Sequence, residues 1–188
     1  MSFGANASHI TLPEDGVLMT KPDTLPFAEA AVLADGPTTS LHFLRDLGKL
    51  RPGEHVLILA GSGSLGSAAI QIARALGATV SATASARNAD LLAQLGADHV
   101  IDYHAQDPMP RGAEYDVIFD TIGATTYAKA KPALAKGGRY LSPVLGLGLL
   151  GHMLSSRLVG SKRARFTAVG LQKPAQNRAL LSDVLSLI

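Results

Sequence analysis

Cysteine is absent from the 188-residue chain, so disulfides and a cysteine-ligated zinc site are both excluded. The longest uncharged apolar run, residues 141–150, is too short to cross a bilayer and is interrupted by Pro143 and two glycines. The first residues lack the basic flank and continuous apolar segment of a secretion signal. We therefore expect a cytoplasmic protein with no membrane segment.

A strong charge of one sign is also lacking, because 17 Lys and Arg nearly balance 15 Asp and Glu. The one short basic cluster, Lys162 to Arg165, is typical of a solvated loop, so neither nucleic acid nor a membrane surface is an expected partner. The six histidines show no pair at metal-ligand spacing, and we expect no metal site. Neither the GxSxG turn of hydrolases nor the Lys-Ser/Thr ending of a P-loop occurs. The expected partner is a small-molecule substrate.

One stretch joins an apolar segment, a glycine-rich turn and an amphipathic segment without interruption. Residues 56–59 are apolar on both faces, which is typical of a central parallel strand. In the following GxGxxG turn, Gly61 suits a tight turn, Gly63 permits close approach of a pyrophosphate, and Gly66 permits close packing of helix on strand. Gly77 is the expected cap of the helix. The pattern predicts a dinucleotide phosphate site, and a purely structural turn is the alternative.

The rest of the chain alternates between strand-like and helix-like segments, as a parallel sheet requires. The expected strands are residues 56–59, 79–84, 99–102, 117–120, 139–144 and 166–169. Helices are expected near residues 88–95, 125–136 and 175–188, with a kink or restart at Pro132 and closure of the second by Gly137 and Gly138. Six strands predict an α/β fold, a doubly wound parallel Rossmann sheet in the order 3-2-1-4-5-6.

The first fifty residues follow a different pattern. Two short strands, 9–12 and 17–20, flank a Pro-Glu-Asp-Gly turn, and helices are expected from Pro26 and over 38–47, the latter capped by Gly48. Such short strands cannot form a stable sheet alone. We therefore interpret residues 1–35 as a small remnant of a second, β-rich domain, 36–174 as the Rossmann domain, and 175–188 as a helix that leads back toward that second domain.

The motifs LPEDG, LHFLRDLGKLRPGEHVLI, GSGSLGSAAIQIARALGA, LGADHVIDY and YDVIFDTIG occur in the order and at the spacings of a known family. The chain resembles the zinc-independent medium-chain dehydrogenase/reductase family of quinone oxidoreductase type over nearly its whole length. The resemblance implies an NADP(H)-dependent reductase of quinones, enones or related carbonyl compounds. Most of the family's GroES-like catalytic domain has no counterpart here, which implies a truncated member or a domain cut from a polyketide synthase enoyl reductase.

The resemblance also assigns cofactor-binding residues. The phosphate loop corresponds to Gly61, Ser62, Gly63, Ser64, Leu65 and Gly66. After the second strand, Ser85 and Arg87 replace the acid that would hold the ribose of NAD, which favours the 2′-phosphate of NADP. The alternative is a helix cap at Ser85 and an ordinary surface cation at Arg87. Tyr103 flanks the same phosphate, or else it is a rim aromatic.

On the nicotinamide side the resemblance points to Thr39, Ile122 and Val144. Thr39 has the alternative of an ordinary hydroxyl near a helix N-terminus. Asp120 either contacts the cofactor or acts as a structural hydrogen-bond acceptor. Val144 departs from the family's glycine-rich strand end, and no side chain is an obvious proton donor.

The leading hypothesis is hydride transfer from NADPH to an electron-poor carbonyl, enone or quinone. Alternatives are a non-catalytic NADP(H)-binding module, an excised enoyl reductase domain, and a methyltransferase, which the missing acid after the second strand disfavours. We also expect a homodimer joined through an edge strand near residues 165–169.

Overall fold

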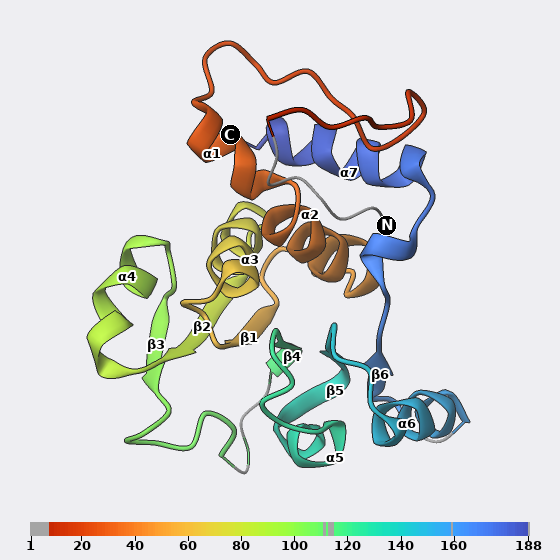
Figure 1. Ribbon diagram of the computed structural model, residues 1–188. Coiled ribbons are helices and arrows are strands. Elements are labelled where there is room, and N and C mark those ends of the chain that lie inside the picture. Colours follow the sequence, from red (N-terminus) through yellow and green to blue (C-terminus); the bar gives the residue numbers. More distant parts are fainter. Residues whose placement is uncertain (1–7, 111, 113–114, 159, 188) are drawn as a thin grey trace.

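The computed structural model describes residues 8–110, 112, 115–158 and 160–187. Its core is a six-stranded, all-parallel sheet in the order β3-β2-β1-β4-β5-β6 (Figure 1), which confirms the predicted Rossmann topology. The strands are β1 (His55–Leu59), β2 (Thr79–Ala84), β3 (His99–Asp102), β4 (Tyr115–Asp120), β5 (Leu134–Leu141) and β6 (Arg163–Arg165).

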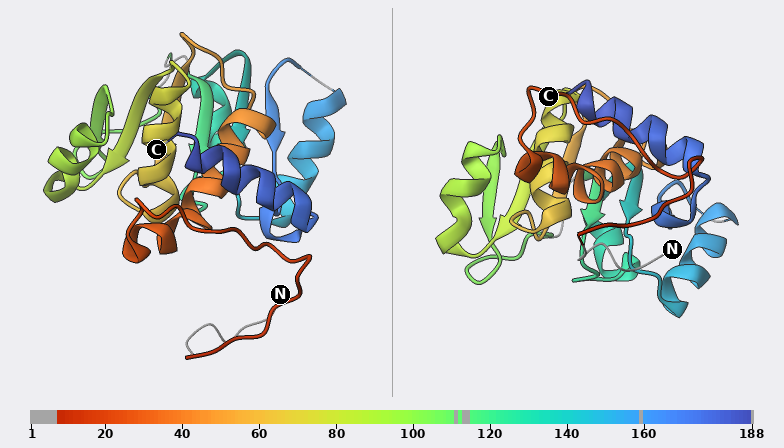
Figure 2. Two further views of the ribbon diagram at one scale, coloured as in Figure 1. Left: turned by 90° about the horizontal axis from the view of Figure 1, so that it is seen from above. Right: turned by 45° about the horizontal axis from the view of Figure 1, so that its top comes forward.

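Helices cover both faces of this sheet, as the further views in Figure 2 show. The α-helices are α1 (Phe27–Leu33), α2 (Gly36–Leu41), α3 (Ser64–Ala75), α4 (Ala89–Gln94), α5 (Tyr127–Ala130), α6 (Leu147–Leu158) and α7 (Pro174–Leu185). A π-helical segment, η1 (His42–Leu47), continues α2, and short 3₁₀ turns are η2 (Ala86–Asn88), η3 (Lys131–Ala133) and η4 (Val169–Leu171).

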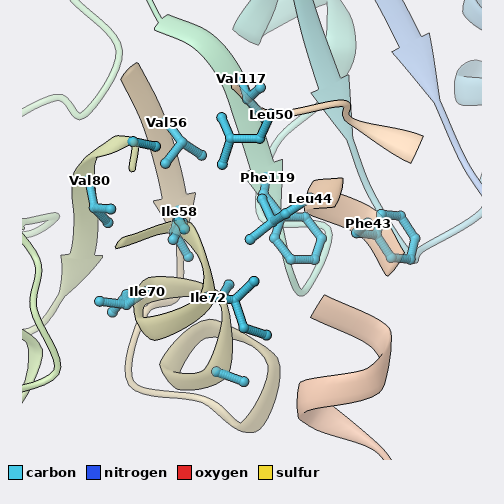
Figure 3. Packing of buried hydrophobic residues seen from close by; sticks show 14 of the residues in the cluster. Phe43, Leu44, Leu50, Val56, Ile58, Ile70, Ile72, Val80, Val117 and Phe119 are labelled. Carbon is cyan, nitrogen blue, oxygen red and sulfur yellow. The ribbon is translucent and has the colours of Figure 1, made fainter. Parts of the chain in front are cut away.

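The larger core lies between the sheet and the helices α2, α3, α4 and α7. Val56 and Ile58 of β1 point to this side, while Leu57 and Leu59 point to the smaller core under α5 and α6, so the strand is apolar on both faces as predicted. Figure 3 shows how the larger core packs around the rings of Phe43 and Phe119, which stack with centroids 5.1 Å apart. This core fixes α3 against β1, and thereby sets the geometry of the turn between them.

The prediction of a helix over 125–136 is wrong in length. The α-helix stops at Ala130, Pro132 lies in the 3₁₀ turn η3, and β5 begins at Leu134. The expected kink or restart at Pro132 is instead a helix end, since the chain passes from α5 through η3 into β5 without a further α-helical turn. Proline lacks the N–H that would continue a helix. Gly137, with φ +83°, lies inside β5 and does not close a helix.

The elements after β5 also differ from expectation. The predicted strand 166–169 is wrong: β6 spans Arg163–Arg165, and Val169 starts the turn η4. A whole helix, α6, was missed, because its glycines obscure the helical period. Leu149 and Met153, four residues apart on α6, pack on the smaller core and show the apolar face that stabilises it.

Neither predicted N-terminal strand is present in the described part of 8–26, which forms turns and extended chain. A strand needs a neighbour to take its backbone hydrogen bonds, and this segment has none in the described chain. The Pro13 to Gly16 turn is confirmed by a 2.9 Å bond from the Gly16 amide to the Pro13 carbonyl. Arg178 of α7 donates to the carbonyls of Asp15 and Gly16, which holds the segment against α7.

The two helices expected near Pro26 and over 38–47 are confirmed as α1 and as α2 continued by η1, with Gly48 as the C-cap. Helix α7 packs on α2 and buries Leu180 and Val184 in the larger core. Among the helices of the described ranges, none combines the length and apolar character needed to span a bilayer.

Candidate functional site

The predicted site residues gather at one edge of the sheet because the strands are parallel. Leu59 of β1 pairs with Asp120 of β4, and Ala84 of β2 pairs with Asp102 of β3, so these strands end side by side. The phosphate loop, Ser85, Tyr103 and Ile122 all follow directly after these strand ends. Ligands of doubly wound folds bind at this edge.

The glycines of the phosphate loop have different steric surroundings. A β-carbon on Gly66 would lie 2.2 Å from the Ala60 carbonyl oxygen, and one on Gly61 would lie 2.9 Å from Leu92 Cδ2. On Gly63 it would meet only the Ala60 oxygen, at 3.5 Å. Gly66 and Gly61 are therefore needed for packing, whereas Gly63 leaves its outer side open. The left-handed residue of the turn is Ala60, with φ +59°, while Gly61 does not have a positive φ.

Two further residues, Thr83 and Ser40, hold the loop in place. The Thr83 hydroxyl accepts from the Ala60 amide at 3.0 Å, and the Thr83 carbonyl accepts from the Gly61 amide at 2.8 Å. Ser40 of α2 donates to the Leu65 carbonyl at 2.8 Å. Sequence reasoning missed Thr83 and Ser40, because other hydroxyl residues stand close to each of them in the chain and only burial shows which ones need a partner.

The loop ends in the N-terminus of α3, a helix of twelve residues. The amides of Ser64, Leu65 and Gly66 are its first three and have no partner inside the helix. They carry the positive end of the helix dipole, which attracts anions. Ser62 lies beside them, with its hydroxyl 3.2 Å from the Asn88 side-chain amide. Together with the open side of Gly63, this arrangement fits a pyrophosphate.

Ser85, Arg87 and Tyr103 lie together where β2 and β3 end. Ser85 makes no side-chain capping bond to η2, so the alternative of a helix cap is not realised; its carbonyl accepts from the Asn88 amide at 2.9 Å. Arg87 is exposed and forms no ion pair with any described residue. Tyr103 is 52% exposed. A partly exposed serine, an exposed arginine and an exposed tyrosine thus follow the adjoining ends of β2 and β3.

The loops after β4 and β5 meet on the other half of the edge. A β-carbon on Gly123 would lie 3.2 Å from Val144 Cβ, so the two loops are in contact. Ile122 and Val144 are exposed large apolar residues at this junction. They form an apolar surface beside the expected place of a nicotinamide ring.

Asp120 is fully buried. It acts as a structural hydrogen-bond acceptor, which was one of the two roles that the sequence suggested for it. Its carboxylate accepts from the amides of Ala124 and Thr125 and from the Tyr140 hydroxyl, each at 2.9 Å. Burial, together with the neighbouring carboxylate, raises the pKa of Tyr140 well above its ordinary range. The pair shapes the loop that carries Ile122.

Thr39 lies apart from the loop contacts. It lines a hollow of about 220 Å³ with Asn177 and Leu181 of α7, while its neighbours Gly36 and Ser40 contact the phosphate loop. Eleven of the twelve predicted residues therefore lie at the carboxyl ends of the strands. Thr39 lies to one side of them, in α2.

Comparison with known proteins identifies the family. Residues 64–185 match the family model described as zinc-binding dehydrogenase. The chain is 36% identical over 146 residues to the chloroplastic NADPH-dependent alkenal/one oxidoreductase of Arabidopsis thaliana, covering 74% of this chain and 36% of that protein. It is 32% identical over 185 residues to a phenolphthiocerol/phthiocerol polyketide synthase protein of Mycobacterium tuberculosis, covering 87% of this chain and 8% of that protein.

Among solved structures, a quinone oxidoreductase of Pseudomonas syringae matches with a TM-score of 0.75 and 28% identity, over 90% of this chain and 55% of that one. The chain thus spans little more than half of that structure, and less of the other two relatives.

A zinc site, which the family's description suggests, does not fit the described residues. They contain no group of three or more His, Cys, Asp or Glu side chains that could hold a metal ion, and the chain has no cysteine. The glycine-rich loop between β1 and α3, by contrast, fits the family. On the family model, the shared motifs and the fold, the chain belongs to the zinc-binding dehydrogenases as a quinone oxidoreductase-like member of the medium-chain dehydrogenase/reductase family.

Proposed function

We propose that the chain binds NADP(H) and serves zinc-independent hydride transfer to a quinone, enone or related carbonyl compound. The observation that carries the proposal is the loop at Gly63, open to the outside and backed by the free amides of α3, next to a strand end with Arg87 and no acid. An anionic dinucleotide with an additional phosphate matches both features.

Each part of the cofactor has a candidate position. The amides of Ser64 to Gly66 would hold the pyrophosphate, and Ser85, Arg87 and Tyr103 would hold the 2′-phosphate. Ile122 and Val144 would pack on the nicotinamide, with Thr39 at its flank. When bound, the cofactor supplies a hydride, and the reduced acceptor takes its remaining proton from elsewhere.

Tyr140 does not serve as that proton source in this proposal. Its hydroxyl lies against Asp120, and burial raises its pKa, so it holds its proton firmly. The donor would be water or a group of the remaining part of the enzyme. The chain's own residues bind the cofactor, orient the ring and exclude water from one side of it.

A second candidate is a non-catalytic NADP(H)-binding module or an enoyl reductase domain within a larger synthase. The observation in its favour is that 87% of this chain aligns with only 8% of the polyketide synthase protein, so the similar region there is a small part of a much longer chain. In this proposal residues 1–35 belong to a second domain. Groups that take part in catalysis besides the cofactor come from outside the Rossmann domain, residues 36–174. Cytoplasmic location remains a prediction in both cases.

Calorimetric titration with NADPH and NADH tests the cofactor assignment. We expect NADPH to bind at least ten-fold more tightly, and Arg87→Ala to remove that preference by weakening NADPH alone, since charge-assisted hydrogen bonds contribute about 1.5–3 kcal/mol. Arg74→Ala is the matched control, because Arg74 is an exposed arginine in the neighbouring helix α3. Equal affinity for both cofactors, or a chain that binds neither, would overturn the proposal.

Turnover separates the two candidates. NADPH oxidation by the chain in the presence of a benzoquinone or an enone would support the reductase. Tight NADPH binding without turnover would support the binding module.

A further inference from the structure

Helix α2 and the π-helical segment η1 form one continuous helix over residues 36–47, which lies between α3 and α7 (Figure 1). The backbone stays helical at the junction, where Leu41 has φ −60° and His42 has φ −61°. Within η1 the helix widens, because the Gly48 amide donates to the Phe43 carbonyl, five residues earlier, at 2.7 Å. π-Helical turns are rare and occur often at functional sites. The two halves of this helix contact different parts of the molecule.

The N-terminal half of this helix is fixed to the phosphate loop. Ser40 is fully buried, and its hydroxyl donates to the Leu65 carbonyl, in the first turn of α3, at 2.8 Å. A β-carbon on Gly36 would lie 2.5 Å from Ser64 Oγ, so α2 also packs closely on the residue that starts α3. Ser64 and Leu65 carry two of the three amides that face the expected pyrophosphate. A shift of α2 would therefore move the amides that bind the anion.

Five side chains join the C-terminal half of the helix to the segment after β6. Arg45 donates to Asp183 of α7 at 2.8 Å and to Asp46 at 2.6 Å. His42 bonds to Asp46 through Nδ1 at 3.1 Å and to the side-chain nitrogen of Gln172 through Nε2 at 2.9 Å. Because an amide nitrogen can only donate, Nε2 is the acceptor and Nδ1 is the donor. We call these five residues the η1–α7 network; the His42 side chain within it is only 16% exposed.

The charges of this network orient η1 and contribute little to the stability of the fold. Burial alone would raise the pKa of the Asp46 carboxyl, but the bonds from Arg45 and His42 outweigh it and lower this pKa. The side chains of Arg45 and Asp183 are 37% and 47% exposed, and ion pairs as exposed as this one stabilise a fold only weakly. Loss of the network should therefore leave the fold intact and change mainly the orientation of η1.

We infer that the η1–α7 network positions the phosphate loop, because Arg45 and His42 fix one end of a stiff helix that holds Leu65 through Ser40. Cofactor affinity then depends on the docking of α7, and by linkage a bound cofactor tightens that docking. The inference rests on the proposed function for its effect on cofactor binding, but not for its effect on the loop. Arg45 and His42 are positioning residues and do not contact the cofactor themselves.

The double variant Gln172→Ala/Asp183→Ala tests this, because it removes both partners on the C-terminal segment without changing the helix 36–47. In calorimetric titrations of the full chain we expect it to weaken NADPH and NADH by the same factor, at least about five-fold. The factor is equal because both cofactors carry the pyrophosphate, whereas Arg87→Ala should weaken NADPH alone. Asp183→Glu, which keeps the carboxylate, should bind both cofactors as the wild type does. Ser182→Ala is the matched control, since Ser182 is an exposed residue of α7 whose side chain forms no bond within the described chain.

Ser40→Ala tests whether the network acts through the bond to Leu65. This variant should weaken both cofactors about as much as the double variant does. Adding Gln172→Ala/Asp183→Ala to Ser40→Ala should weaken them by less than about a further two-fold, because residues that act through one contact are not additive. A full second loss in the triple variant would overturn the inference, and so would a double variant that binds both cofactors like the wild type.

Amide hydrogen exchange without a cofactor separates this inference from the proposed function. The Ser67 amide donates to the Gly63 carbonyl at 2.9 Å in the first turn of α3, so its exchange reports how well the loop is held. We expect this exchange to be at least about five-fold faster in the double variant and unchanged in Ser182→Ala. Faster exchange in a chain that binds neither cofactor supports the network and refutes the proposed function. Unchanged exchange overturns the inference, whether or not the chain binds NADPH.

Discussion

At the residue scale, Gly63 and Gly66 belong to one turn but serve different purposes. A methyl group on Gly66 would clash with the Ala60 backbone, whereas on Gly63 it would make only an ordinary contact with the Ala60 oxygen, at 3.5 Å. Gly66→Ala should therefore lower the free energy of unfolding by about 1–3 kcal/mol and weaken NADPH binding. Gly63→Ala should keep the unfolding temperature within a few degrees and still weaken NADPH by at least ten-fold. Thermal unfolding and titration of both variants check this, and a stable Gly66→Ala would contradict the packing argument.

Tyr140 and Asp120 lead to a prediction about alkaline stability. Burial and the Asp120 carboxylate raise the pKa of Tyr140 above its ordinary value near 10, so the folded chain holds this proton more tightly than the unfolded chain. The stability that the proton contributes is complete below about pH 10 and is lost as the pH rises further. Tyr140→Phe should cost about 1–3 kcal/mol at neutral pH and flatten the decline above pH 10. Urea unfolding from about pH 8 to 11 measures the cost at neutral pH and the decline above pH 10. The variant of the exposed Tyr103, Tyr103→Phe, is the control. If the unfolding free energy fell with pH at the same rate in the wild type and both variants, the assignment to Tyr140 would be wrong.

At the scale of elements, Arg139 joins β5 to the connection between η1 and β1. Its guanidinium binds both Glu54 oxygens, at 2.9 and 2.6 Å, and donates to the Gly48 and Lys49 carbonyls. Burial alone would raise the pKa of Glu54, but the bonds from Arg139 and the Arg51 amide outweigh it and lower this pKa. The ion pair is 12% and 19% exposed, so it is screened little by solvent.

Arg139→Lys should therefore lower the free energy of unfolding by about 2–4 kcal/mol, because lysine cannot form the bidentate pair. Arg74→Lys is the control, since its 3.6 Å pair with Asp98 is largely exposed and should change stability by less than about 1 kcal/mol. Since the folded pKa of Glu54 is the lower one, its contribution is present above the ordinary pKa of 4.5 and is lost as the pH falls below it. Acid unfolding of Arg139→Lys should accordingly show a weaker pH dependence than that of the wild type.

At the scale of the whole molecule, the sheet ends at β6 on one side, where a second copy could extend it. The homodimer remains a prediction. The edge strand expected near residues 165–169 is β6, which spans Arg163–Arg165. Sedimentation velocity at micromolar concentration should show twice the chain mass of 19.5 kDa. A single-chain mass over the whole concentration range would rule this dimer out.

The strands β1 to β3 and the helix α3 were predictable because each is a continuous segment whose apolar pattern has one stable arrangement. The segments after β4 were less predictable. Gly137 and the glycines of α6 permit several backbone conformations, and contacts with the smaller core select one of them. The N-terminal segments failed as strands because strand formation depends on a neighbour that the described chain does not supply.

The sequence by itself determined the sheet order, the family and the phosphate loop, because these depend on local patterns: apolar strands, glycine spacing and a following amphipathic helix. Only the tertiary structure decided which groups support that loop and where hollows lie in the molecule. Thr83 and Ser40 each bond to a partner more than 20 residues away, and Asp120 bonds to Tyr140, which is 20 residues away. The hollow of about 300 Å³ lined by Tyr140, Ser142 and His152 likewise lies between separate elements of the chain. Side-chain satisfaction and empty space are properties of packing in three dimensions, and no local pattern along the chain encodes them.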